Sequence, residues 1–257
     1  MPEIGDSDEK VRAATAGLAG RRALVTGASG GIGGAIAAAL AAEGAALCLV
    51  GRNEDRLARI EHQAHRLGAV KTMALAADLG TEDALHIVAA EVKRGFAGLD
   101  ILVHAAGVYE RGPVETLPTD FLDHQYRVNL RGPYLLTQLL LPALHASGGD
   151  IIFINSSQGV AAGAELAQYA ATQHSRKALA DSLRAEVNAE GVRVLTLFLG
   201  RTATGRMAEI FAREGRAYAP QKLLQPADVA AMLVAVLRLP RHAEVTEIAM
   251  RPAEKSY

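Results

Sequence analysis

Short apolar runs alternate with longer amphipathic stretches along almost the whole chain. The short runs predict β-strands at Ala23–Thr26, Ala46–Val50, Lys71–Ala76, Ile101–His104, Asp150–Asn155, Arg193–Phe198 and Val245–Met250. The longer stretches predict helices at about Gly31–Glu43, Glu54–Leu67, Glu82–Gly95, Thr119–Ala146, Leu166–Ala189 and Pro226–Leu237. This alternation predicts an α/β fold with a doubly wound, parallel, seven-stranded sheet that helices cover on both faces.

The chain is predicted to form one domain over residues 20–257, because no linker or repeat divides it. Half of the residues are apolar, which is enough for a sizeable core. The acidic, polar start of the chain does not fit a signal peptide, and we expect residues 1–19 to form a flexible N-terminal arm. The charged segment Arg201–Leu224 follows a predicted strand end, and we expect it to be an irregular lid over a binding site.

Composition excludes several classes of partner. The net charge is −1, so neither nucleic acid nor an anionic membrane surface is expected. No uncharged apolar run reaches the about 18 residues of a membrane-spanning helix. The single cysteine, Cys48, lies in an apolar run, which predicts a buried thiol and a cytoplasmic location. The eight histidines lack the spacing of metal ligands, so no metal site is predicted.

A glycine-rich turn follows the first predicted strand, in the segment TGASGGIG at residues 26–33. Glycines let the backbone approach a pyrophosphate closely, and the N-terminus of the next helix offers it N–H groups and a positive dipole. Such a turn can also be glycine-rich for tight packing alone. Because it lies directly between a strand and a helix, we predict a dinucleotide-binding site that includes Gly27, Ser29, Gly31, Ile32 and Gly33.

A second motif combines a serine, a tyrosine and a glutamine. Tyr169 stands thirteen residues after Ser156, and Gln173 stands four residues after Tyr169. Together with the glycine turn, this segment closely resembles the active-site pattern of the short-chain dehydrogenase/reductase family, in its compact type. The resemblance spans about residues 20–250 and implies a Rossmann-like fold and hydride transfer between a nicotinamide and a carbonyl or alcohol.

The resemblance implies a role for each matched residue of the reaction site. Tyr169 would exchange a proton with the carbonyl oxygen of the substrate, and Ser156 would hydrogen-bond the same oxygen. Asn129 lies in the segment VNLRG and matches an asparagine that locally distorts a helix and holds a water on the proton relay. The predicted catalytic residues are therefore Asn129, Ser156, Tyr169 and Gln173, and the last two would also contact the cofactor.

The same resemblance places residues from three loops against the cofactor. Asp78 and Leu79 would contact the adenine, although Asp78 can instead cap the helix that follows. Thr204 would contact the nicotinamide carboxamide, although it too can be a helix cap. The segment HAAG at residues 104–107 replaces a family segment with two asparagines. Its small residues, Ala105 to Gly107, would still let the cofactor lie close.

His104, which begins that segment, is interpreted as a packed, hydrogen-bonded histidine rather than an acid or base.

The end of the second strand bears on the choice of cofactor. Family members that use NAD carry a carboxylate for the ribose where this chain has Gly51. Arg52 follows at once and suits a 2′-phosphate, although a solvated surface arginine is the alternative. We therefore predict NADP(H), with NAD(H) as the alternative. Gly30, where NADP-preferring members often carry a basic residue, does not add to this preference.

Gln173 departs from the family, which has a lysine at this position. A phenol has a pKa of about 10, and the lysine lowers it by placing a cation nearby. On an ideal helix, Arg176 lies about 10 Å and Lys177 about 12 Å along the axis from Tyr169, at about 1.5 Å per residue. His174 is turned roughly 140° away at about 100° per residue. None of the three is predicted to replace the cation.

The sequence therefore predicts an oxidoreductase weakened by Gln173. The alternatives are a catalytically silent nucleotide-binding protein, acting as a sensor or non-catalytic subunit, and a glutamine introduced to trap a complex. The expected substrate is a small hydrophobic carbonyl or alcohol, because we interpret the candidate pocket residues Val108, Tyr109, Gln158 and Leu166 and the lid as mostly apolar or small. Family members commonly form dimers or tetramers, so the resemblance implies a homo-oligomer.

Overall fold

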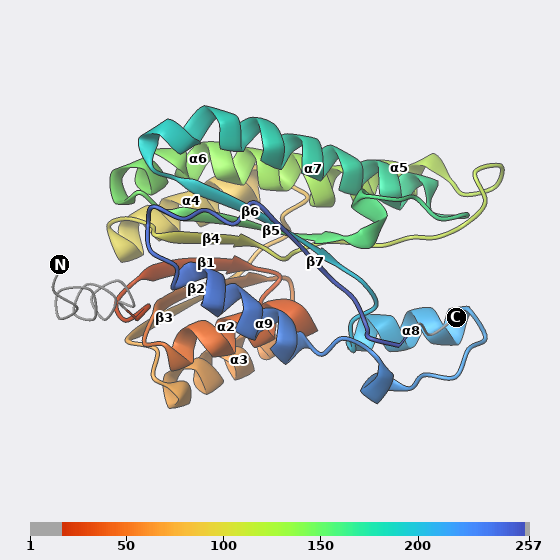
Figure 1. Cartoon of the computed structure of the whole chain (residues 1–257), viewed down its shortest axis with the longest axis horizontal. Coiled ribbons are helices and arrows are strands. Elements are labelled where there is room, and N and C mark those ends of the chain that lie inside the picture. The colour runs from red at the N-terminus through yellow and green to blue at the C-terminus, as the bar shows by residue number, and fades with distance from the viewer. Residues whose placement is uncertain (1–16, 255–257) are drawn as a thin grey trace, which may run out of the picture.

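One sheet of parallel strands runs through the computed structural model, which describes residues 17–254. Its strand order is β3-β2-β1-β4-β5-β6-β7 (Figure 1). The strands are β1 (Arg22–Thr26), β2 (Ala46–Gly51), β3 (Lys71–Ala76), β4 (Ile101–His104), β5 (Asp150–Ser156), β6 (Arg193–Leu199) and β7 (Glu247–Met250). The predicted doubly wound sheet of seven parallel strands is confirmed.

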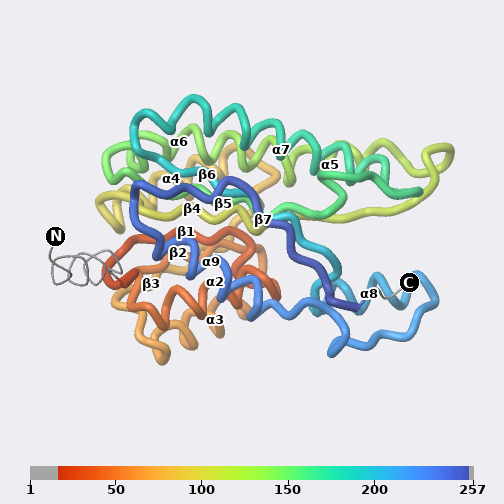
Figure 2. The backbone as a smooth tube through the Cα atoms, in the orientation of Figure 1, coloured from red at the N-terminus to blue at the C-terminus, as the bar shows by residue number. Residues whose placement is uncertain are grey.

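Helices cover both faces of this sheet, as Figures 1 and 2 show. One layer contains α2 (Gly31–Ala42), α3 (Glu54–Leu67) and α9 (Pro226–Leu237). The other contains α4 (Glu82–Phe96), α5 (Thr119–Tyr126), α6 (Gly132–Ser147) and α7 (Ala167–Val187). Shorter turns are the π-helical η1 (Arg127–Arg131) and the 3₁₀-helical η2 (Ser157–Gly159), η3 (Asn188–Glu190) and η4 (Pro220–Lys222).

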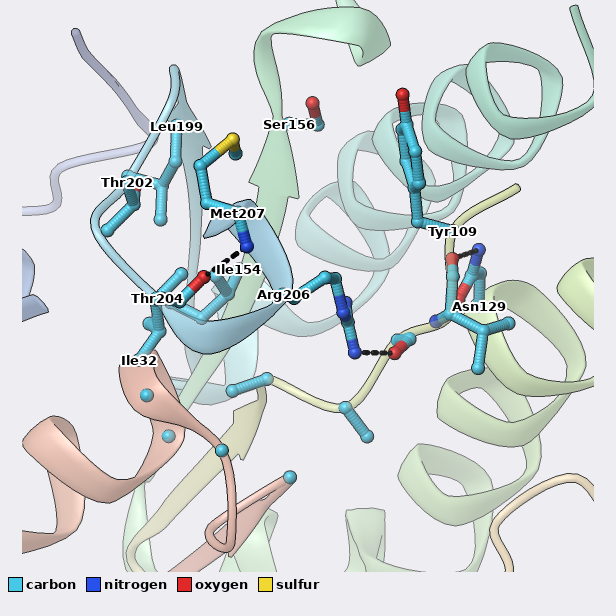
Figure 3. Close-up of a pocket in the computed structure, with 18 of the residues that line it drawn as sticks. Ile32, Tyr109, Asn129, Ile154, Ser156, Leu199, Thr202, Thr204, Arg206 and Met207 are labelled. Atoms are coloured by element: carbon cyan, nitrogen blue, oxygen red, sulfur yellow. Dashed lines mark hydrogen bonds between the residues drawn. The ribbon is translucent and has the colours of Figure 1, made fainter. Parts of the chain in front are cut away.

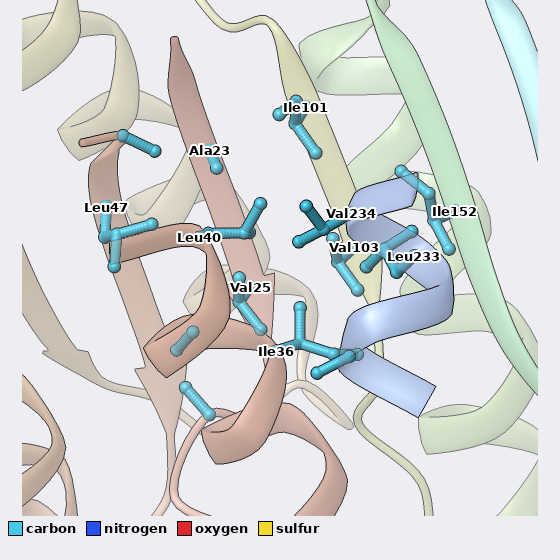
Figure 4. Packing of buried hydrophobic residues seen from close by; sticks show 14 of the residues in the cluster. Ala23, Val25, Ile36, Leu40, Leu47, Ile101, Val103, Ile152, Leu233 and Val234 are labelled. Carbon is cyan, nitrogen blue, oxygen red and sulfur yellow. The ribbon is translucent and has the colours of Figure 1, made fainter. Parts of the chain in front are cut away.

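The central strands are buried on both sides, which explains their continuous apolar runs. Along β1, Val25 packs among Ile36 and Leu233 of the α2–α9 layer, whereas the neighbouring Leu24 faces the α4–α6 layer (Figure 4). Cys48 of β2 is fully buried, and burial raises the pKa of its thiol to about 12. The predicted buried thiol is therefore confirmed, and this thiol is unreactive at neutral pH.

The lid differs from its prediction. Helix α8 spans Gly205–Arg213, inside the segment predicted as irregular. The Thr204 hydroxyl caps it by accepting from the Met207 N–H at 3.2 Å, and Ile210 and Phe211 are buried beneath it. A capping threonine followed by apolar residues at helical spacing is a signal that the high charge of the segment obscured.

The ordered domain begins before residue 20. Leu18 is only 1% exposed and belongs to the core, and the Gly20 N–H donates to the Gly44 carbonyl at 2.9 Å. The predicted arm therefore ends too late, and its residues 1–16 lie outside the described part of the chain. Within residues 17–254, no helix has both the length and the apolar character needed to cross a membrane.

An ion cluster stands at the start of β5, at the amino edge of the sheet. The buried Asp150 carboxylate contacts Arg21 and Arg193, each at 2.7 Å, and Arg241 at 3.0 Å. Arg193 also donates to carbonyl groups of the segment before β7, including that of Ala243 at 3.0 Å. The cluster joins chain segments far apart in sequence at the edge of the sheet opposite the loops that line the cleft.

Candidate active site

The chain order reverses on the two sides of β1, since β1 lies between β2 and β4. Ligands of doubly wound sheets bind where the order reverses, beyond the carboxyl ends of the strands. A cleft of about 770 Å³ lies there, a size typical of a ligand site. The predicted site residues that line it are Gly27, Ser29, Gly31, Ile32, Gly33, Arg52, Asp78, Leu79, Ala105, Gly107, Asn129, Ser156, Tyr169, Gln173 and Thr204.

The glycine turn forms one end of this cleft. Gly27 has a φ of +67°, and a Cβ there would lie 2.8 Å from the Ala106 nitrogen. A Cβ on Gly33 would meet the Gly27 carbonyl oxygen closer still, so neither position admits a side chain without movement. The N-terminus of α2 opens directly from this turn. The residues therefore fit a pyrophosphate, which needs close backbone approach and the N–H groups of a helix start.

The outer end of the cleft lies beside the end of β2. The space beside Gly51 is taken by the Ser29 side chain, because a Cβ on Gly51 would lie 2.6 Å from the Ser29 hydroxyl oxygen. Arg52 lines the cleft with an exposed side chain, and Arg56 of α3 lines it too, while the predicted contact of Arg52 with a 2′-phosphate stays a prediction. Sequence reasoning missed Arg56. Its place in the first turn of the helix that begins directly after Arg52 and Asn53 is the signal that was available.

Asp78 lies at the cleft without capping α4. Its Oδ1 accepts from the Gly80 N–H at 3.0 Å and so closes a tight turn before the helix. Thr81 occupies the capping position of α4, and its side chain makes no capping bond there. The alternative interpretation of Asp78 as the helix cap is therefore wrong, while its predicted adenine contact stays a prediction.

Asn129 stands inside η1, the π-helical turn between α5 and α6. Its Oδ1 accepts from the Val108 N–H at 2.8 Å, while its Nδ2 donates to the Val108 carbonyl at 2.9 Å and to Thr172 Oγ1 at 3.1 Å. The helix predicted over about Thr119–Ala146 is present as α5, η1 and α6 in direct succession, and its turn widens where Asn129 ties the loop after β4 to α7. The local distortion expected at Asn129 is present.

Ser156 ends β5, and Tyr169 lies in the first turn of α7. Ser156 Oγ accepts from the Gln158 N–H at 3.2 Å. The Tyr169 ring meets the Tyr109 ring edge-on, with centroids 4.9 Å apart. Burial raises the pKa of Tyr169, while a hydrogen bond with Ser156 and the charges of Arg176 and Arg206 lower it. Tyr169 is therefore a protonated donor at neutral pH, and its environment already contains charges that favour the phenolate.

Gln173 lies one turn after Tyr169 and is 2% exposed. Its backbone carbonyl accepts from Asn155 Nδ2 at 3.1 Å, and its side-chain Nε2 donates to Thr172 Oγ1 at 3.3 Å. The side chain is thus joined through Thr172 to Asn129. The structure brings the four predicted catalytic residues to one cleft, and Gln173 supplies polar atoms there without a charge.

The neighbouring basic side chains of α7 take different directions. Lys177 turns outward to Asp181 at 2.8 Å and Glu247 at 2.5 Å, and His174 bonds the Ala170 carbonyl at 2.9 Å. Arg176 instead lines the cleft, is 2% exposed, and donates from Nη2 to the His104 carbonyl at 2.9 Å. The axial distance used in the sequence analysis therefore does not keep this cation out of the cleft, and whether it replaces the lysine stays a prediction. That distance was taken from the backbone rise along the helix axis, whereas helical side chains lean toward the N-terminus.

His104 is packed and neutral, as interpreted from the sequence. It is buried, its Nε2 lies 2.8 Å from Thr137 Oγ1, and its ring stacks on Phe153 with centroids 4.9 Å apart. Burial and the nearby Arg176 charge lower the pKa of His104 to about 3. At neutral pH this side chain neither carries a charge nor acts as an acid.

Helix α8 closes the cleft from the side opposite α7 (Figure 3). Thr204 caps this helix, so its capping alternative is correct, and it also lines the cleft against Gly31. Arg206 donates from Nη2 to the Gly107 carbonyl at 2.7 Å, which spans the cleft. The lid also contributes the charged Arg201 and Glu214. Its description as mostly apolar or small is therefore wrong.

Comparisons with known proteins agree with this site. A family model described as short chain dehydrogenase matches residues 21–215. An uncharacterized oxidoreductase of Staphylococcus aureus is 31% identical over 238 residues, covering 91% of this chain and 98% of that protein. A Thermococcus sibiricus alcohol dehydrogenase complexed with 5-hydroxy-NADP superposes with a TM-score of 0.83 at 27% identity, covering 92% and 99% of the two chains. A metagenomic short-chain oxidoreductase in complex with NADP gives 0.80 at 31% identity, covering 93% and 99%.

Proposed function

Because the chain belongs to the short-chain dehydrogenase family, we propose that it transfers hydride between NADP(H) and a small carbonyl or alcohol substrate. The observation that carries this proposal is the cleft that holds both the glycine turn and the pair Ser156 and Tyr169. A fold alone does not define an activity, but a dinucleotide cradle beside a half-buried proton donor does indicate one. The catalytically silent alternative is not favoured, because Arg176 leaves a cation at the site despite Gln173.

The side chains of this site act on the substrate oxygen. When bound, the reduced nicotinamide supplies a hydride to the carbonyl carbon. Tyr169 gives its phenolic proton to the carbonyl oxygen, so that the carbonyl becomes an alcohol and the tyrosine becomes a phenolate. Ser156 hydrogen-bonds the same oxygen and holds it beside the phenol. A proton from solvent then restores Tyr169, and alcohol oxidation follows the same steps in reverse.

The substrate is proposed to be small and hydrophobic because Tyr109, whose ring meets that of Tyr169, and Leu166 line the cleft. Their apolar surfaces suit a hydrophobic substituent on the carbonyl carbon. A panel of small ketones and aldehydes with NADPH tests this, with nucleotide binding followed separately by fluorescence. Turnover of panel members is the expected result. Failure to bind either NADPH or NADH would refute the proposal.

Arg52 and Arg56 are proposed to select NADP(H) by contacting a 2′-phosphate, and the NADP complexes of related structures support this choice. Replacing both by alanine should weaken NADPH binding about tenfold, because charge-assisted bonds to the phosphate are lost at an exposed site. NADH binding should stay nearly constant. Fluorescence titration measures both affinities, and Arg59→Ala, on the exposed surface of α3 outside the cleft, is the matched control. An equal loss for both nucleotides would contradict selection by these arginines.

A homo-dimer or homo-tetramer is also proposed. Large apolar side chains are exposed along α5 and the start of α6, with Tyr126 48% and Tyr134 53% exposed. Exposed apolar groups gathered on one surface indicate an interface between chains. Light scattering should give a mass at least twice that of one chain. Replacing Tyr126 and Tyr134 by glutamate should lower the mass, and a monomeric native protein would contradict the proposal.

A further inference from the structure

Arg176 carries a buried charge without a compensating carboxylate. It is among the largest fully buried side chains of the described residues. Its Nη2 bonds the His104 carbonyl, its Nε has no partner, and its guanidinium carbon lies 6.0 Å from the centroid of the Phe153 ring. Within residues 17–254 no carboxylate forms an ion pair with it. A buried cation in this situation costs several kcal/mol, so a negative charge that forms nearby would offset part of this cost.

The position of Arg176 indicates which group that partner is. It follows Tyr169 by seven residues, which returns a helical side chain to within roughly 20° of the same face. Both residues line the same cleft, and Gln173 lies between them on that face. Because helical side chains lean toward the N-terminus, the long arginine side chain extends back from its Cα toward Tyr169. Its bond to the His104 carbonyl fixes the guanidinium at the end of β4.

We propose that Arg176 supplies the positive charge that Gln173 lacks, and that this charge stabilises the phenolate of Tyr169. Arg176 is thus an electrostatic positioning residue that acts through Tyr169. The proposal rests on the proposed function, in which Tyr169 is the proton donor. It assigns the cation of this site to a different position of the same helix, where the long side chain makes up for the greater distance along the axis.

The other groups around Tyr169 do not account for the same effect. Arg206 of α8 also lowers the pKa of Tyr169, but it is exposed and bonds the Gly107 carbonyl. Water screens an exposed charge more than a buried one. Ser156 contributes a hydrogen bond, Tyr109 a neutral ring, and His104 is neutral. Burial lowers the pKa of Arg176 to about 10, so it remains charged at neutral pH.

The test follows the titration of Tyr169 directly, in protein without cofactor or substrate. Tyrosine labelled at the ring carbon that bears the hydroxyl reports phenolate formation by NMR, and Tyr169→Phe assigns the signal. Arg176→Met should raise the pKa of Tyr169 by about 1–2 units, because a nearby opposite charge is removed. Lys177→Met removes the same charge from the adjacent residue, which faces outward, and should leave the titration within about 0.3 units, the expected effect of a screened charge. An unchanged Tyr169 titration in folded Arg176→Met would overturn the proposal.

Two further variants separate charge from packing. Arg176→Gln keeps a donor for the His104 carbonyl and should show the same shift, which preserves the test if Arg176→Met does not fold. Adding Gln173→Lys to Arg176→Met should return the pKa of Tyr169 toward its native value. If the pKa of Tyr169 stays raised in the double variant, the role of Arg176 is not purely electrostatic and the proposal is contradicted. Since these measurements need no turnover, absence of activity would refute the proposed function while leaving this inference standing.

Discussion

Replacing Tyr169 by phenylalanine is expected to lower kcat by about 10²–10⁴-fold, the usual contribution of a positioned proton donor. The ring keeps its edge-on contact with Tyr109, so the local packing is retained. NADPH affinity should fall by no more than about tenfold, the loss of one hydrogen bond to the cofactor, because the main effect of the variant is on the reaction step. Steady-state kinetics and nucleotide titration measure the two quantities. Tyr126→Phe, at an exposed position of α5, is the matched control.

The pH dependence of alcohol oxidation provides a second test of Tyr169 with the same variant. Burial raises the pKa of Tyr169, so the deprotonated form needed for alcohol oxidation accumulates only at alkaline pH. The native oxidation rate should therefore climb through the alkaline range, and Tyr169→Phe should remove that rise. Reduction uses the protonated form and should be level near neutrality, falling where oxidation rises. A native oxidation rate that is flat between about pH 7 and about pH 10, when chemistry limits turnover, would contradict the role of Tyr169.

Replacing Asp150 by alanine is expected to lower the free energy of unfolding by about 3–5 kcal/mol. Asp150 is the shared carboxylate of Arg21, Arg193 and Arg241, and its removal leaves their charges close together. The charge of Arg193 loses the most stabilisation, because its side chain is only 9% exposed. Urea unfolding monitored by circular dichroism gives the change, with the slope of the transition checked for two-state behaviour.

A surface carboxylate provides the comparison for Asp150. Asp181 also contacts two cations, Lys177 and Arg184, but its side chain is 41% exposed. Asp181→Ala should therefore cost no more than about 1 kcal/mol. Similar losses in the two variants would mean that burial of the Asp150 cluster contributes little to stability.

The fold could be predicted because its signals are local. Buried parallel strands read as short apolar runs, so β4 begins and ends at the predicted residues, as does the less buried edge strand β3. Helix α3 was equally clear, since Asn53 caps it and acidic residues fill its first turn. The residues of the candidate site followed from motif spacing, because strand ends and helix starts bring them to one edge of a parallel sheet.

What the sequence did not reveal depends on tertiary contacts. Helical periodicity alone does not register the wider turn at Asn129, which was expected only from the family resemblance and arises from its bonds to Val108 in another loop. Arg176 was placed by its distance along an ideal axis, yet its side chain runs toward the end of β4. The destination of a long, flexible side chain depends on the cavities and carbonyl groups that the fold provides. Motif spacing therefore located the site without locating its charge.

Strand β5 connects two regions with separate tasks. It begins at Asp150, in the ion cluster, and ends at Ser156, in the cleft, six residues later. At about 3.3 Å per residue these positions lie roughly 20 Å apart. Substitutions that far apart, without shared partners, act additively to within about 0.5 kcal/mol. The chain can thus acquire new substrate preferences at one end of this strand while its thermal tolerance is adjusted independently at the other.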